Sequence, residues 1–158
     1  MNEKDLIYDW NSINWELKRD ETKHPHEIWF DDETLRDGLQ SPSARNPTIE
    51  QKIELLTYME KLGVQKVDLG LPGAGKFHVE HIDAMLKHIV DNDYKIRPGT
   101  AVRTLISDIE PLIDLQAKYE IPIQASAFLG TSPIRQYSEA WTIEKLISTM
   151  EKAVGFAI

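Results

Sequence analysis

The stretch Asp32-Glu33-Thr34-Leu35-Arg36-Asp37-Gly38-Leu39-Gln40 decides the fold assignment of this chain. It follows a short apolar run, Ile28-Trp29-Phe30, which is a strand candidate, and it leads into a polar loop. An arginine next to a carboxylate at the end of a strand is able to neutralise an oxyanion and bind a metal ion side by side. Spacing alone leaves an ordinary loop salt bridge as an equally good interpretation of Arg36 and Asp37.

Outward from this stretch, short apolar runs alternate with amphipathic segments. The sequence predicts further strands at residues 64–69, 100–105 and 121–128, and helices at 48–62, 78–90, 108–119 and from 142 onward. Alternating β and α segments imply a parallel sheet with right-handed crossovers, either a doubly wound sheet or a barrel. The fold class is therefore α/β, with four βα units and a polar extension over residues 1–26.

Local signals set the expected ends of the helices. Thr48 and Gln51 form a capping box and Gly63 lies just beyond the end of the first helix. Asp108 is expected to cap the third helix, with Pro111 in its first turn, and Thr142 opens the last one. The first helix is expected to present one apolar face, made of Ile49, Ile53, Leu56, Met59 and Leu62.

Composition restricts the kind of partner. The chain has 158 residues and a formal charge of −8, which argues against binding to nucleic acid or to an anionic membrane. It has no cysteine, so any metal ion must be held by carboxylate, imidazole or water. No apolar run approaches the ~18 residues of a membrane span, and the N-terminus carries charges where a signal peptide needs apolar residues. We expect a cytoplasmic protein.

The stretch 32–40 resembles the D-x-T-L-R-D-G-x-Q signature of a superfamily of metal-dependent barrels. That superfamily contains 2-isopropylmalate, homocitrate and citramalate synthases and hydroxymethylglutaryl-CoA lyase. The resemblance continues through residues 63–72, similar to the family's second strand, and 128–135, similar to its fourth, and covers roughly residues 27–158. It implies a (β/α)8 TIM barrel, of which about the first four βα units, a half barrel, are present, because the whole fold needs ~250 residues.

The resemblance also implies roles for individual residues. Arg36 would be the catalytic group that stabilises the keto or enolate oxygen, and Asp37 a metal ligand. Substrate-binding roles fall to Gln40, Asp68, Arg103, Ser126 and Thr131. Asp68 stands where the family usually has glutamate, and Ser126 and Arg135 stand where synthases often have histidine, which leaves the keto acid open. The family's paired His-x-His ligands lie on a late strand, beyond these four units.

The implied activity is that of an acyltransferase that condenses acetyl-CoA with an α-keto acid, with Mg²⁺, Mn²⁺ or Zn²⁺ as cofactor. Residues 132–137 resemble the 2-isopropylmalate synthase branch of leucine biosynthesis, in which the keto acid is 2-oxoisovalerate. Homocitrate or citramalate synthesis and the reverse lyase reaction stay open. We expect a homo-oligomer, or dependence on a C-terminal barrel half.

Other classes of function have their own sequence support. The chain is alternatively a catalytically silent half barrel that pairs with a partner half, since open sheets expose strand edges. Residues 70–76 fit the G-x-x-x-x-G-K pattern of a phosphate loop, but Phe77 replaces the Ser or Thr that holds Mg²⁺. Two histidine pairs, His24 with His26 and His78 with His81, are candidate metal ligands, with packing as the simpler interpretation.

Overall fold

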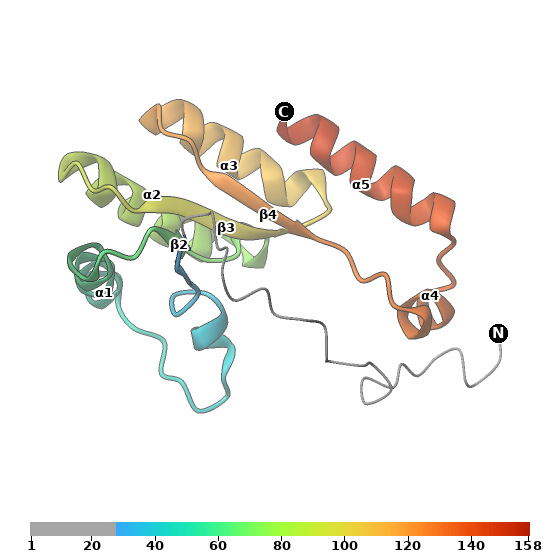
Figure 1. Cartoon of the computed structure of the whole chain (residues 1–158), viewed down its shortest axis with the longest axis horizontal. Helices are drawn as coiled ribbons and strands as arrows, with labels where there is room; N and C mark the ends of the chain where they lie inside the picture. The colour runs from blue at the N-terminus through green and yellow to red at the C-terminus, as the bar shows by residue number, and fades with distance from the viewer. Residues whose placement is uncertain (1–27) are drawn as a thin grey trace, which may run out of the picture. The chain divides into compact units, whose positions relative to one another are not determined.

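The computed structural model describes residues 28–158, which form an α/β half barrel with a four-stranded parallel sheet in the order β1-β2-β3-β4 (Figure 1). The elements run β1 Asp31–Asp32, η3 Asp37–Gln40, α1 Ile49–Leu62, β2 Lys66–Asp68, η4 Pro72–Ala74, α2 Lys76–Asp91, β3 Arg97–Arg103, α3 Ile106–Tyr119, β4 Gln124–Phe128, α4 Pro133–Glu139 and α5 Ile143–Ala157. The extension predicted at residues 1–26 and its histidine pair lie outside the described residues.

The described residues divide into two compact units. The larger unit holds residues 29–129 with 149–158, and the smaller holds residue 28 with 130–148. Every strand and the helices α1, α2 and α3 belong to the larger unit, whereas α4 belongs to the smaller. Among residues 28–158, none of the helices has both the length and the apolar character that a membrane span requires.

The register of the parallel sheet decides which side chains share a face. Gly99 of β3 lies opposite Asp68 of β2, and Ala101 and Arg103 lie opposite Ser126 and Phe128 of β4. Because side chains alternate along a strand, Asp68, Arg103 and Ser126 lie on one face. The other face is buried under helices, with Val67 in a core shared with α1 and α2.

The predicted signals of α1 are confirmed at both ends. Thr48 Oγ1 accepts from Gln51 N at 3.4 Å, Gln51 Oε1 accepts from Thr48 N at 2.9 Å, and Gly63 ends the helix with φ 76°. The predicted apolar face is partly wrong, because Leu62 is 82% exposed. Lys52, which the apolar pattern left out, is buried instead.

The strand boundaries differ from the prediction at the first strand. β1 is Asp31–Asp32 and not residues 28–30. The backbone of Phe30 forms hydrogen bonds with the two residues around the start of β2. Its N–H donates to Gln65 Oε1, and its carbonyl oxygen accepts from Lys66 N–H. The strand β1 therefore begins directly after the apolar run, which is exposed at Ile28 and Phe30.

Two helix predictions need correction. The third helix begins at Ile106 with Leu105 as its N-cap, so Asp108 lies inside the first turn and Pro111 inside the helix. The segment 128–135, likened to the family's fourth strand, leaves the sheet at Phe128 and enters the short helix α4. The N-terminal signal of α4 was readable, because Ser132 Oγ accepts from Arg135 N and a proline follows it. Thr142 caps α5 as predicted, with Oγ1 accepting from Lys145 N at 3.2 Å.

Candidate active site

Arg36 lies between β1 and η3, at the carboxyl edge of the sheet. Its Nε donates to Asp68 Oδ2 at 3.2 Å and its Nη1 to Asp37 Oδ1 at 3.1 Å, while Nη2 pairs with Glu33. Asp68 is the last residue of β2, so the guanidinium joins the ends of two neighbouring strands. A parallel barrel gathers its active-site groups at this edge.

Asp68 is the anchor of this arrangement. Its side chain is nearly buried, and Oδ1 accepts from Gly70 N at 3.0 Å and from Ala101 N at 3.3 Å. Burial raises the pKa of Asp68, against the opposing effect of these two N–H groups and of Arg36. Both carboxylate oxygens of Asp68 therefore accept hydrogen bonds. Asp68 orients Arg36 from a position that is nearly closed to solvent.

Asp37 differs from Asp68 in exposure. Its side chain is largely open to solvent, and within residues 28–158 it forms an ion pair with Arg36 alone. Residues 28–158 contain no group of three histidine or acidic side chains that could hold a metal ion. These residues alone therefore do not fit a metal site, and the ligand role of Asp37 stays a prediction.

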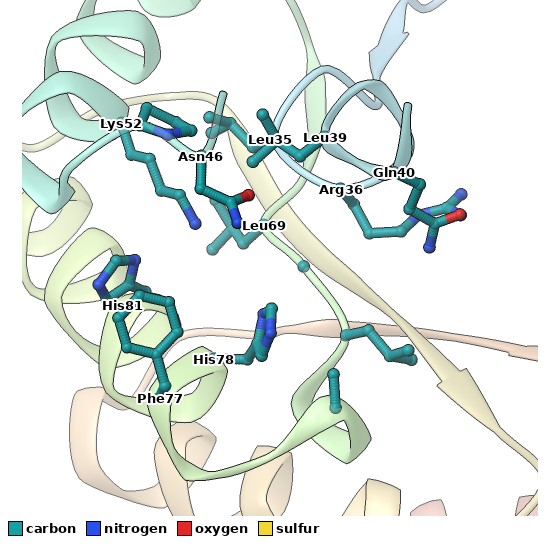
Figure 2. Close-up of a pocket in the computed structure, with 14 residues that line it drawn as sticks. Leu35, Arg36, Leu39, Gln40, Asn46, Lys52, Leu69, Phe77, His78 and His81 are labelled. Atoms are coloured by element: carbon teal, nitrogen blue, oxygen red, sulfur yellow. The ribbon is translucent and has the colours of Figure 1, made fainter. Parts of the chain in front are cut away.

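A cavity of about 220 Å³ opens beside Arg36, between α1, α2 and the loops that follow β1 and β2. Its lining is Leu35, Arg36, Leu39, Gln40, Asn46, Pro47, Lys52, Leu69, Gly70, Leu71, Ala74, Phe77, His78 and His81. Figure 2 shows Arg36 and Gln40 at one end, with Lys52 and His81 at the other. Gln40, predicted to line a substrate pocket, is thus at a cavity wall, whereas Asp37 is not.

Arg103 is engaged in a second ion pair. Its Nε donates to Asp108 Oδ2 at 2.7 Å and its Nη2 to Asp108 Oδ1 at 2.8 Å, and Nη2 also donates to the carbonyl of Gly73. These bonds tie η4 to the start of α3. Arg103 lies on the same face of the sheet as Asp68. Its guanidinium donates to Asp108 and to the Gly73 carbonyl, and its substrate-binding role stays a prediction.

The comparison with known proteins decides the family. The HMGL-like family model matches residues 27–158. The chain belongs to the HMGL-like family. Its fold is accordingly the first part of a TIM barrel, in agreement with the four parallel βα units.

Several relatives of this HMGL-like chain are named 2-isopropylmalate synthase. It is 28% identical over 134 residues to the 2-isopropylmalate synthase of Aquifex aeolicus (strain VF5), covering 82% of this chain and 24% of that protein. It is 31% identical over 148 residues to that of Neisseria gonorrhoeae (strain ATCC 700825 / FA 1090), covering 91% of this chain and 23% of that protein. The chain thus spans about a quarter of the length of the curated relatives that it matches.

The remaining predicted site residues of the HMGL-like chain, Ser126 and Thr131, make no hydrogen bond with Arg36 among the bonds of residues 28–158. Ser126 is exposed on β4, where its Oγ accepts from Gln124 Nε2 at 3.2 Å. Thr131 belongs to the smaller unit, where its carbonyl accepts from Gln136 Nε2 at 2.8 Å. The structure therefore brings together Arg36, Asp37 and Asp68, and the substrate-binding roles of Ser126 and Thr131 stay predictions.

Sequence reasoning missed two charged residues near Arg36. Glu33 pairs with the guanidinium, one helical turn before it, and Lys52 lines the cavity. Lys52 was detectable, because Ile49, Lys52, Leu56 and Met59 follow a 3-4-3 spacing that places all four on one helical face. A lysine inside such a stripe indicates either a buried stem or a site.

The phosphate-loop hypothesis receives no support from the geometry of residues 70–76. The side chain of Lys76 is 91% exposed and lies 3.5 Å from Glu80 Oε1, on the outside of α2. Residues 72–74 form a 3-10 turn that begins with Pro72, which has no N–H to offer. The loop therefore does not wrap around its own lysine as a nucleotide-binding loop does.

Proposed function

We propose that this HMGL-like chain contributes the first part of the active site of an acyltransferase that condenses acetyl-CoA with an α-keto acid. The observation that carries the proposal is the guanidinium of Arg36, held across the ends of β1 and β2 by Asp68 and adjacent to the exposed Asp37. Because relatives are named 2-isopropylmalate synthase, the keto acid that we propose is 2-oxoisovalerate, and the pathway is leucine biosynthesis.

The proposed role of Arg36 follows from the charge that the reaction develops. In a Claisen-type condensation, an enolate attacks a keto carbon, and negative charge gathers on the carbonyl oxygen. A fixed guanidinium stabilises that charge without reorganising, because Asp68 already orients it. Loss of one such donor costs about 10²–10³ in rate in enzymes that stabilise an oxyanion.

The family resemblance also implies a divalent metal, for which the described residues supply a single candidate ligand, Asp37. We therefore assign no step to the metal. The proposal predicts that further ligands come from parts of the full-length enzyme beyond the described residues, in line with the quarter of the relatives' length that the chain spans.

The test is release of free CoA from acetyl-CoA and 2-oxoisovalerate in the presence of Mg²⁺ or Mn²⁺. The chain is assayed alone and together with the remaining barrel of a 2-isopropylmalate synthase supplied as a separate polypeptide. We expect activity in the combined sample, and a loss of about 100-fold or more for Arg36→Ala. Arg45→Ala, an exposed arginine in the same loop, is the matched control and is expected to keep full activity.

Two results would count against the proposal. Full activity of Arg36→Ala in the combined sample would remove Arg36 from the reaction. A combined sample that assembles but releases no CoA would favour the silent half barrel, in which Arg36 and Asp68 serve only to hold the strand ends together.

A further inference from the structure

The cavity beside Arg36 contains a buried cation without a partner. Lys52 is 5% exposed and lines the cavity from α1, and its ammonium group has no hydrogen bond or ion pair with any of residues 28–158. Burial lowers the pKa of Lys52 accordingly. An ammonium group removed from water is costly unless an anion or several acceptors compensate for it. A ligand with negative charge would provide that compensation.

The opposite wall of the cavity adds donors from a helix N-terminus. His78 and His81 come from the first two turns of the 16-residue helix α2, and both line the cavity. His81 Nδ1 is buried and has no hydrogen-bond partner in the described part of the chain. Figure 2 shows Lys52 and the Asn46 amide side by side, with His81 and His78 across from them. The helix N-terminus contributes partial positive charge to the same space.

The ionisable side chains that line the cavity are all basic. No carboxylate is among the lining residues, although the whole chain has a formal charge of −8. Burial lowers the pKa of His81, and the charges of Lys52 and His78 lower it further. Glu50 and Glu80, which do not line the cavity, act in the opposite direction and raise this pKa. This arrangement disfavours a bound cation, so His78 and His81 are better suited to an anion than to a metal.

We propose that the cavity formed by Lys52, His78 and His81 is a binding site for a phosphate group. The volume of about 220 Å³ equals about seven waters at ~30 Å³ each, below the ~300–1,000 Å³ of pockets for drug-sized ligands. It therefore fits a compact ion with some water. Three groups able to carry positive charge match a doubly charged oxyanion better than a carboxylate. The buried side chains of Leu35 and Leu69 make part of the wall apolar, which strengthens the electrostatic interactions of these charges.

The first test is calorimetric titration of the purified full chain with inorganic phosphate, at a constant ionic strength of about 0.15 M, where surface charges are screened beyond ~8 Å. We expect saturable binding, weakened at least tenfold by Lys52→Met, which keeps the apolar stem and removes the charge. Lys76→Met is the matched control, since Lys76 lies exposed on the same helix N-terminus outside the cavity. It is expected to bind phosphate within about twofold of the wild type.

The same titration distinguishes the source of the phosphate group. Methyl phosphate that binds as well as inorganic phosphate indicates a phosphate ester as the natural ligand, and binding of inorganic phosphate alone indicates the free ion. Acetate serves as the singly charged comparison. Acetate binding as tight as phosphate binding would overturn the proposal, as would the absence of saturable phosphate binding or an equal loss in Lys52→Met and Lys76→Met.

Folding of the variants is followed separately. Without phosphate, Lys52→Met should unfold at the same temperature as the wild type or higher, because it removes an unpaired buried charge. Phosphate should raise the Tm of the wild type, since a ligand of the native state stabilises it, and leave that of Lys52→Met unchanged. His81→Gln is a second variant on the opposite wall, and normal phosphate binding by it would also contradict the site.

Discussion

Asp108 is the more enclosed of the two buried carboxylates among the described residues, with 1% of its surface exposed. Its hydrogen bonds with the Arg103 side chain hold the pKa of Asp108 below its usual range, although burial alone would raise it. A carboxyl group with a lowered pKa in the folded state stabilises the fold above its unfolded pKa of ~3.9. That stabilisation disappears as the pH falls through the folded pKa.

Asp108→Asn tests this contribution. At pH 7 we expect the free energy of unfolding to fall by about 1.5–3 kcal/mol, the range for a hydrogen bond to a charged group. The loss stays within this range because the half-exposed Arg103 side chain is hydrated again once the carboxylate is gone. The difference between the two proteins should shrink as the pH falls below the unfolded value of ~3.9 and through the lowered folded pKa of Asp108. Urea unfolding at pH 7 and pH 2.5 measures both values. Asp93→Asn, at an exposed pair with Lys95, should change the unfolding free energy by under about 0.5 kcal/mol at either pH.

At the scale of elements, two glycines predict opposite effects of the same substitution. A Cβ on Gly73 would lie 2.2 Å from the carboxylate of Asp108, so alanine there would push η4 away from α3. Gly155 lies inside α5 with no atom within 4 Å of the corresponding position. Gly73→Ala should lower the free energy of unfolding by about 1–3 kcal/mol, as overpacking does. Gly155→Ala should raise it by up to about 0.5–1 kcal/mol, since glycine disfavours a helix. Equal shifts in urea midpoint for the two variants would contradict this packing.

The elements also show what the sequence could and could not predict. The capping box at Thr48 and the glycine end at Gly63 are local signals, and the structure has both. The exposure of Leu62 depends on where α2 lies against α1, which no local pattern contains, whereas the 3-4-3 spacing already places Lys52 on the buried face of α1. The first strand was placed on residues 28–30 because apolar runs usually mark strands, whereas the side chain of Gln65 binds that segment before the ladder begins.

The candidate site, like the helices and strands, could be predicted only in part from the sequence. The motif at residues 32–40 pointed to Arg36 and Asp37 through family resemblance, and it carried no information on which strand would hold the guanidinium. The bond from Arg36 to Asp68 spans 32 residues, so it requires the register of β1 against β2. The pairing of Arg103 with Asp108 was hidden by the expectation that Asp108 caps a helix, because both arrangements use a carboxylate near the same helix start.

At the scale of the whole molecule, the sheet has two outer strands. In the order β1-β2-β3-β4, each of β1 and β4 pairs on one side only within residues 28–158. A closed barrel has no such edges, and an open, exposed edge is a template for pairing with another chain. The β4 edge also carries Ser126 and Phe128, which are both exposed.

We therefore expect the purified 158-residue chain to associate with copies of itself through β4. Sedimentation velocity between about 5 and 100 µM should show a weight-average mass above that of one chain, 18.1 kDa, and increasing with concentration. Ser126→Lys should shift the distribution toward the monomer, because lysine on an edge strand opposes pairing between strands. Ser138→Lys makes the same chemical change on the helix α4, which is not part of the sheet, and should leave the association unchanged. A wild type that stays monomeric at the highest concentration, or an equal effect of the two lysines, would show that this edge does not pair.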